Sequence, residues 1–383
     1  MKWQSVAPAR RQGLIRSMIL TDRRWGQIYY LGAALASGHL ALAWVQDATP
    51  LLNLRQFAAG QEKLPYQYRA LTAWILRPLE ESASLSRFVH GLSAPLNDGI
   101  MIYMALIAFL SVLASTLITQ KTILHFTGDV RFSRVASFLV IYMSYFNYVL
   151  GFRANYLLPY DFPALFFFCA GLYCIVTRRM TLYYIVFVLS VFNKETSCFL
   201  TLIYLAYEAS EQGRSWRRMA MHTVAQAAIW VAAKYLLFEL YGGERVAAQN
   251  LGDTSNFFFQ TKVGRNLVYL AQPQHWPTIF STFGYLWIVL LVGARRIVHP
   301  GLRNLLPVIA LWMLSMFVFG IVIEIRVYGE MISVVAVLVA VIIYDFLQSG
   351  WLQQRPIGSI HGGWKTAGSS TKPDDDARRR STR

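Results

Sequence analysis

The sequence predicts an all-α integral membrane protein with about ten membrane segments, and two observations predict this class. Of the 383 residues, 55% are hydrophobic and only 15% are charged, whereas soluble globular proteins carry about a quarter charged residues. The hydrophobic residues also lie in long runs, and a helix needs about 20 of them to cross a bilayer. This composition excludes a disordered chain, a disulfide-stapled secreted module and an ordinary soluble enzyme.

Eight apolar runs have the composition of membrane-spanning helices. A further stretch, residues 181–208, is interrupted by the polar segment NKETS at residues 193–197. That stretch fits either one long span with charges at its centre or two short helices of about 18 Å each. The eight uninterrupted runs cover residues 28–45, 99–119, 135–151, 158–177, 219–240, 278–294, 304–323 and 327–347.

The distribution of lysine and arginine decides between these alternatives, because cytoplasmic loops carry an excess of both. If residues 181–208 pass the membrane an even number of times, 24 of the 36 basic residues lie on the side of the N-terminus. A single pass moves 13 of those 24 to the opposite side and brings only four back. We therefore predict ten segments with both termini in the cytoplasm. A bacterial inner membrane is expected, although an ER membrane would give the same asymmetry.

Three regions follow from this topology. Residues 1–26 form a basic cytoplasmic tail, residues 27–347 form the membrane domain, and residues 348–383 form a polar tail that is expected to be disordered. The net charge of +16 is concentrated beside the apolar runs and in the tails. Such charges favour anionic membrane lipids as partners and do not indicate nucleic-acid binding.

The outer side carries the unusual features. The first outer loop, residues 46–98, is the longest loop, and within it the apolar side chains of residues 68–81 fall on one face of a helical wheel. This pattern predicts a helix that lies in the outer interface of the membrane. Residues 49–59 and 261–271 show weaker versions of the same pattern.

Charged groups at the outer end of the spans form the candidate site, because charge in a bilayer is costly and marks function. The most informative group is Asn193-Lys194-Glu195, between the two short helices. Broken helices at membrane depth need a protein-lined or water-filled cavity around their free backbone groups. The alternative is a structural ion pair that holds the hairpin, for instance Glu195 with Lys234.

Two further candidates also have structural alternatives. Asp161 stands at the start of the run 158–177, where with Pro163 in the first turn it can act as a cap. Glu324 and Arg326 can pair with each other in a tight turn. No HExxH, P-loop, GxGxxG or GxSxG motif is present. The sequence therefore identifies no metal ligands and supports no cofactor, although a divalent metal stays an open alternative, and it does not support ATP hydrolysis, dinucleotide chemistry or serine hydrolysis.

The organisation of residues 27–347 resembles the GT-C class of polytopic glycosyltransferases, which use polyprenyl-linked sugar donors. Asp47 follows the first span, where that class has its first-loop acid. Tyr68-Arg69, Tyr160-Asp161, Asn193-Lys194-Glu195-Thr196 and Glu324-x-Arg326 are also similar to uncharacterised bacterial integral membrane proteins of this kind. Many members carry paired acids in the first loop. Here Asp47 stands alone, with Glu62 fifteen residues away, so no acid pair supports a divalent metal.

The resemblance implies transfer of a sugar from a polyprenyl-phosphate donor at the outer face of the membrane. Asp47 is then the candidate catalytic base. Arg69, Lys194 and Arg326 would stabilise the leaving phosphate, and Glu195 would orient Lys194 or bind a sugar hydroxyl. The candidate substrate-binding residues are Glu62, Arg69, Asp161, Asn193, Lys194, Glu195, Glu324 and Arg326.

Two other classes of function remain open. A transporter or flippase for a lipid-linked or small polar substrate also uses broken helices and buried charges. Such a protein would be favoured by broken helices in the second half of the chain, but residues 304–323 and 327–347 look continuous. A non-catalytic membrane protein is the third alternative, and it predicts that the outer charges can be replaced freely.

Overall fold

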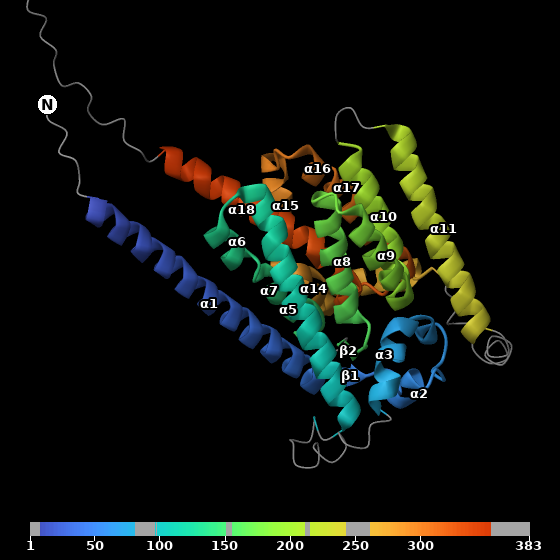
Figure 1. Ribbon diagram of the computed structural model, residues 1–383. Coiled ribbons are helices and arrows are strands. Elements are labelled where there is room, and N and C mark those ends of the chain that lie inside the picture. Colours follow the sequence, from blue (N-terminus) through green and yellow to red (C-terminus); the bar gives the residue numbers. More distant parts are fainter. Residues whose placement is uncertain are drawn as a thin grey trace, which may run out of the picture. The chain divides into compact units, whose positions relative to one another are not determined.

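The computed structural model describes residues 8–80, 96, 98–150, 155–210, 215–242 and 261–353. The chain forms two compact units, Met1–Asp345 and Phe346–Arg383. The described residues are helical except for turns, short connections and two strands of two residues each, which confirms the predicted all-α class. The helices of the first unit run side by side in Figure 1.

Within the described residues, five helical segments are long and apolar enough to cross a membrane. These lengths and compositions are compatible with an integral membrane protein, and the prediction of ten segments stays a prediction. The five are Arg24–Asp47 within α1 (Pro8–Asp47), α5 (Gly99–Thr127), α11 (Trp216–Tyr241), Pro300–Phe319 with α16 (Pro300–Arg303) and α17 (Leu305–Phe319), and Ile325–Gly350 with η8 (Ile325–Met331) and α18 (Ile332–Gln353).

Two of the predicted spans are not single straight helices. Residues 135–151 contain the end of α6 (Val130–Ala136) and α7 (Leu139–Tyr148), which are separate helices. Residues 278–294 belong to a pair of helical segments that bends by 72° between Phe280 and Thr282. The elements of this pair are η5 (Pro273–His275), α14 (Trp276–Phe280), η6 (Thr282–Tyr285), α15 (Trp287–Gly293) and η7 (Ala294–Arg296).

The bend is explained by left-handed backbone at three consecutive residues. Phe283, Gly284 and Tyr285 have φ of 57°, 60° and 64°, a conformation that no α-helix contains. Asn147 of α7 holds the turn, because its Oδ1 accepts a hydrogen bond from the Phe283 amide at 2.9 Å. Apolar composition alone does not reveal such a turn, which is why the sequence predicted a continuous span.

The interrupted stretch 181–208 consists of two short helices, which is the second of the two alternatives that the sequence left open. Lys194 has extended backbone, with φ −158° and ψ 144°, and ends the first helix. A short 3-10 turn then leads into the second helix. The elements are α9 (Met180–Asn193), η3 (Glu195–Ser197) and α10 (Cys198–Glu208), and they follow α8 (Asp161–Val176).

The first outer loop contains the predicted helix, and the face that packs on the protein is not the face predicted to lie in the membrane interface. Ala70, Ala73 and Leu76 are buried, whereas Trp74 and Ile75 are 42% and 45% exposed. Small residues let the helix lie close to the protein and leave its large apolar side chains free. The loop is built from β1 (Thr49–Pro50), α2 (Leu54–Ala58), η1 (Tyr66–Tyr68) and α3 (Ala70–Glu80), and β1 pairs in parallel with β2 (Tyr156–Leu157).

The helix predicted at residues 261–271 is also present, as α13 (Val263–Ala271). At the two ends of the chain the helices run further than expected. Helix α1 begins at Pro8, inside the predicted basic tail, and α18 continues to Gln353, beyond the predicted end at residue 347. The rest of the predicted tail, residues 354–383, lies outside the described residues.

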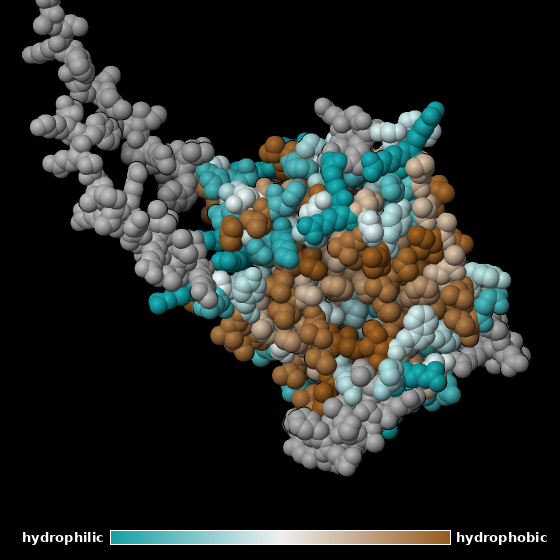
Figure 2. Space-filling view, viewed as in Figure 1, coloured by the Kyte–Doolittle hydropathy of each residue, from teal (hydrophilic) through white to brown (hydrophobic). Residues whose placement is uncertain are grey.

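The core of the first unit lies around the N-terminal half of α18. Residues 334–340 of this helix are all buried, and all of them are aliphatic. Helix α5 packs against both α1 and α8. On the face shown in Figure 2, apolar residues form a broad band between polar regions at its two ends.

Candidate functional site

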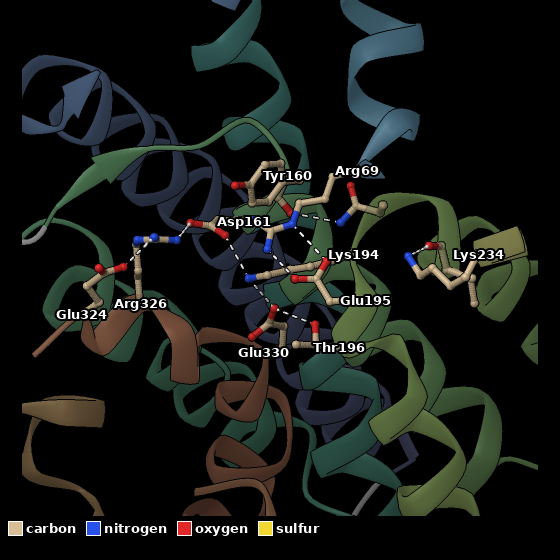
Figure 3. Close-up of polar contacts among 12 residues, drawn as sticks. Arg69, Tyr160, Asp161, Lys194, Glu195, Thr196, Lys234, Glu324, Arg326 and Glu330 are labelled. Atoms are coloured by element: carbon tan, nitrogen blue, oxygen red, sulfur yellow. Dashed lines mark hydrogen bonds and ion pairs between the residues drawn. The ribbon is translucent and has the colours of Figure 1, made fainter. Parts of the chain in front are cut away.

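Lys194 is the centre of a buried network of charges, drawn in Figure 3. Its Nζ lies 3.0 Å from Asp161 Oδ1 and 2.6 Å from Glu330 Oε1. Both carboxylate side chains are fully buried, and the Lys194 side chain is only 7% exposed. One ammonium group is therefore shared by two carboxylates, one at the start of α8 and one in η8.

The break between α9 and α10 points Lys194 into this position. Asn193, the last residue of α9, donates from Nδ2 to the Tyr160 carbonyl at 3.0 Å. Its Oδ1 accepts from the Thr72 hydroxyl of α3, also at 3.0 Å. The side chain thereby ties the end of α9 to α3 and to the start of α8, and this fixes the extended backbone of Lys194.

Arg326 joins the network from the other side. Its guanidinium lies 3.4 Å from Asp161 Oδ2 and 2.7 Å from Glu324 Oε2. It also lies over the ring of Tyr156, 5.3 Å from the ring centroid. Asp161 thus accepts from Lys194 and from Arg326 with its two oxygens. The predicted local pair of Glu324 and Arg326 is confirmed.

Arg69 and Glu195 form the third part of the network. Arg69 Nε donates to Glu195 Oε2 at 3.0 Å, and a second nitrogen donates to Oε1 in a bidentate pair. The guanidinium lies 4.2 Å from the centroid of the Tyr160 ring. Glu195 therefore pairs with Arg69 of the first outer loop. Lys234, the partner suggested by sequence, donates to the Val191 carbonyl at 3.0 Å.

The charges of this pair are stabilised by each other. Burial alone raises the pKa of Glu195, but the Arg69 guanidinium outweighs burial and lowers this pKa to about 2. Burial likewise lowers the pKa of Arg69, but the Glu195 carboxylate raises it well above its ordinary value. Both groups are therefore charged at neutral pH, and each holds the other in place.

The network has an inner and an outer layer. Asp161 and Glu330 are fully buried in the inner layer, with Lys194 between them. In the outer layer, the Glu195 and Glu324 side chains keep exposures of 24% and 16%. The outer layer is thus the part that a molecule from outside would reach first.

Tyrosine rings lie beside each of the two arginines of the outer layer. Tyr66 of η1 is partly exposed, and its ring centroid lies 5.8 Å from the Arg69 guanidinium. Burial raises the pKa of Tyr66, whereas the charges of Arg69 and Arg326 act in the opposite direction. Tyr156 lies under Arg326 and is also partly exposed. The outer layer therefore presents cations, carboxylates and aromatic faces together.

Two predicted residues do not join this network. Glu62 is buried, but its two oxygens accept from the amides of Asn53 and Lys63 at 2.8 and 3.0 Å, so it holds the first outer loop together. Asp47 is exposed at the end of α1, and its side chain has no hydrogen bond or ion pair within the described part of the chain. It stands two residues before Thr49, whose strand pairs with that of Tyr156.

Glu330 and Thr196 also belong to the site, although the sequence did not predict either as a substrate-binding residue. Thr196 donates to Glu330 Oε1 at 3.1 Å, next to the contact with Lys194. The available signal was the carboxylate of Glu330 near the start of the apolar run 327–347, and the lysine of another apolar stretch, Lys194, could have been its partner. The sequence gives no indication that Thr196 and Glu330, which are 134 positions apart, contact each other.

Several buried polar atoms near the network have no hydrogen-bond partner among the described residues. A ligand or a water molecule could form the hydrogen bonds that these atoms lack. Three of them can donate and one can only accept while ionised. These atoms are Tyr148 Oη, Tyr160 Oη, Arg326 Nε and Glu330 Oε2.

In the described ranges, no group of three His, Cys, Asp or Glu side chains is arranged to hold a metal ion. No family model, curated protein or solved structure matches the chain. The chemistry of the site is therefore argued from its own residues.

Proposed function

We propose that this protein is a membrane glycosyltransferase, which transfers a sugar from a polyprenyl-phosphate donor to an acceptor at the outer face of the membrane. One observation carries the proposal. Arg69 and Arg326 belong to segments more than 250 residues apart in the chain, and both are bound by carboxylates in one partly exposed layer beside tyrosine rings.

The arginines suit the leaving group of such a reaction. When the bond between the sugar and the phosphate breaks, negative charge develops on the phosphate. Guanidinium groups bind phosphate oxygens through paired hydrogen bonds. Because Glu195 and Glu324 already orient them, Arg69 and Arg326 need little reorganisation to meet the developing charge. Partly exposed Tyr66 and Tyr156 offer apolar faces beside them for a sugar ring.

Asp47 remains the best candidate for the base. The acceptor hydroxyl must lose a proton as its oxygen bonds to the sugar, and a carboxylate that already binds cations is a weaker base. Asp161 and Glu330 both bind Lys194. Asp47 is exposed, without a described hydrogen bond or ion pair, and its helix ends beside the strand pair of Tyr156.

The exposed apolar side chains of α3 support a lipid-linked donor. Trp74 and Ile75 project from the helix that directly follows Arg69. Trp74 also donates from Nε1 to the Tyr241 hydroxyl at the end of α11, at 3.1 Å. Aromatic and aliphatic groups of this kind partition into the membrane interface, so a prenyl chain would lie next to the arginines that bind its phosphate.

The test is the identity of lipids that co-purify with the protein in mild detergent. Mass spectrometry should find a polyprenyl phosphate or a polyprenyl-linked sugar with the wild-type protein and not with an Arg69→Gln/Arg326→Gln variant. Arg55→Gln is the matched control, since Arg55 lies in the same loop in an exposed pair with Asp98. Only bulk phospholipid with all three proteins would contradict the proposal.

A transporter or flippase is the second candidate, and one observation favours it. The bend of 72° between Phe280 and Thr282 means that the second half of the chain also contains a broken helical segment. Discontinuous helices in both halves are common around the substrate sites of transporters. Uptake of solute or movement of lipid in proteoliposomes, without any sugar transfer, would favour this alternative.

A further inference from the structure

Asn147 joins three segments that are far apart in the chain. It lies in the last turn of α7 and is fully buried. Its Oδ1 accepts a hydrogen bond from the Phe283 amide of η6 at 2.9 Å, and its Nδ2 donates to the Ile325 carbonyl at 3.1 Å. One side-chain amide therefore ties the bent pair of helical segments to the first residue of η8.

The second of these bonds acts next to Arg326 of the charge network. The Ile325 carbonyl and the Arg326 amide belong to one planar peptide group, so the bond fixes the plane from which the Arg326 backbone continues. The guanidinium lies at the end of a long side chain, and a small rotation of that plane displaces it further than the backbone. Its contacts with Asp161 Oδ2 at 3.4 Å and Glu324 Oε2 at 2.7 Å, drawn in Figure 3, depend on this placement.

A second contact from α7 lies on the other side of Arg326. Tyr148 directly follows Asn147, and its hydroxyl lies so close to Gly329 that a Cβ there would overlap it. Arg326 stands between Ile325 and Gly329, the two residues of η8 that these contacts reach. The end of α7 therefore supports the part of η8 that contains Arg326.

The turn at Phe283 has contacts with α7 that do not involve Asn147. The Tyr142 hydroxyl donates to the Gly284 carbonyl at 3.1 Å. A Cβ at Gly284 would overlap the Tyr142 ring, so the backbone of the turn also packs closely on α7. When Asn147 is replaced, the turn keeps these contacts, whereas the Ile325 carbonyl loses its side-chain partner.

We propose that Asn147 is a positioning residue, which acts through the Ile325 carbonyl to hold the Arg326 guanidinium where the phosphate of the ligand contacts it. The identity of the ligand as a phosphate rests on the proposed function. An asparagine with a purely structural role affects the stability of the whole unit and no arginine in particular. The two roles therefore differ in their effect on Arg326 relative to Arg69, which belongs to the first outer loop.

The first experiment needs no ligand. Full-length protein in mild detergent is treated with phenylglyoxal, which modifies accessible guanidinium groups, and peptide mass spectrometry locates each modified arginine. Asn147→Leu keeps the approximate size of the side chain and removes both hydrogen bonds. It should raise the modification rate of Arg326 about tenfold, the usual order for lost hydrogen bonds to a charged group, and leave the rate of Arg69 unchanged. Tyr142→Phe is the matched control, since it removes the other hydrogen bond to the turn, and it should change neither rate.

A second variant covers the case in which Asn147→Leu does not fold. Asn147→Ser leaves room for water to satisfy the two backbone groups, so the protein keeps its fold, but the serine is too short to tie them together. It should raise the rate of Arg326 in the same way. An unchanged rate of Arg326 in this variant, or an equal rise at Arg69, would overturn the positioning role.

The second experiment measures the affinity for undecaprenyl phosphate by native mass spectrometry. Asn147→Ser should weaken binding about tenfold in the wild-type and Arg69→Gln backgrounds. It should have no further effect in an Arg326→Gln background, because a residue that acts through Arg326 is coupled to it. Equal losses in all three backgrounds would show a merely structural role. If wild type does not bind this lipid while Arg326 reacts as expected, the proposed function fails and the positioning role stands.

Discussion

Lys194 is held by acids from two segments that are far apart in the chain. Asp161 begins α8 and Glu330 lies in η8, and both contact the same ammonium group. A buried ion pair adds little stability compared with apolar packing, but removal of one partner leaves an unpaired buried charge. Each member of the inner layer is therefore expected to be essential to the fold, whatever the substrate.

Lys194→Met should destabilise the protein by about 3–5 kcal/mol, because Asp161 and Glu330 lose their shared partner. Thermal unfolding in detergent, followed by the fluorescence of the tryptophans, measures this effect. Lys121→Met is the control, since Lys121 is exposed and such substitutions usually change stability by less than about 0.5 kcal/mol. Equal stability of the two variants would show that the inner layer is not structurally coupled.

Glu195 makes the outer layer sensitive to acid. Its pKa of about 2 in the folded chain lies below the ordinary value of 4.5. The ion pair with Arg69 therefore contributes its full free energy above pH 4.5. This contribution falls as the pH drops from 4.5 to about 2, because the unfolded chain then binds the proton first.

The stability difference between wild type and Glu195→Gln should accordingly be large at pH 7 and smaller at pH 3. Asp345→Asn is the control, because the pair of Asp345 and Arg296 is about 40% exposed and contributes at most about 1 kcal/mol. A difference between wild type and Glu195→Gln that is the same at both pH values would be incompatible with a charged, buried pair.

Asp47→Asn should abolish sugar transfer without a loss of stability, because Asp47 is exposed and has no described ion pair. The measurement is transfer of label from the co-purified donor lipid, together with thermal unfolding of the same sample. Full activity in this variant would remove Asp47 as the base, and the proposal would then need another acceptor for the proton.

At the scale of residues, the sequence predicts which charges matter but not how they pair. Arg69, Asp161, Lys194, Glu195, Glu324 and Arg326 stand out because charge is rare in apolar runs, and the structure joins all six in one network. The pairing of Arg69 with Glu195 depends on the packing of a loop against a helix break. No sequence pattern specifies that packing.

Among the elements, η8 depends on a close backbone approach. A Cβ at Gly329 would overlap the hydroxyl of Tyr148, which comes from α7. Gly329→Ala should therefore lower the thermal stability of the protein and displace Glu330, the next residue. The measurement is again thermal unfolding in detergent.

A second substitution tests this explanation. Tyr148→Phe removes the overlapping oxygen and should partly restore the stability of Gly329→Ala. Gly264→Ala is the matched control, since nothing lies within 4 Å of a Cβ there and alanine favours its helix. Failure of Tyr148→Phe to restore any stability would mean that the contact is not the cause.

The elements themselves were only partly predictable. The amphipathic pattern at residues 68–81 predicts α3 correctly, and Trp74 and Ile75 of the predicted interfacial face are exposed while Ala70 and Ala73 pack on the protein. The breaks at Ser137 and at Phe283 were missed. At these positions a tertiary hydrogen bond or a turn interrupts the helix, whereas hydropathy reports only that the segment is apolar.

For the whole molecule, the predicted topology leads to a test of sidedness. Position 55 belongs to the first outer loop, and position 303 belongs to a short segment expected in the cytoplasm. Arg55→Cys and Arg303→Cys, each in a Cys198→Ser background, should react with a membrane-impermeant maleimide from opposite sides. Reaction of both in intact cells would contradict the predicted even number of passes through residues 181–208.

The class of the molecule follows from its composition, but the number of spans does not. In the part of the chain that the structure describes, five helices meet the length and hydropathy expected of a span. Others that the sequence assigns to the membrane, such as α8 and α9, have only 16 and 14 residues. Helices this short cross a membrane only when neighbouring helices pack around them. That packing is a property of the assembled fold and is not specified by the sequence of one helix.

Because Lys194 is shared by Asp161 and Glu330, the order in which the chain is synthesised affects when its ion pairs can form. Residue 194 leaves the ribosome long before residue 330, so for about 130 residues of synthesis the lysine has only Asp161 as its partner. The last helix therefore acts as a closing step of membrane insertion. In a chain that stalls before Glu330 is made, the ammonium of Lys194 would have one carboxylate beside it in place of two.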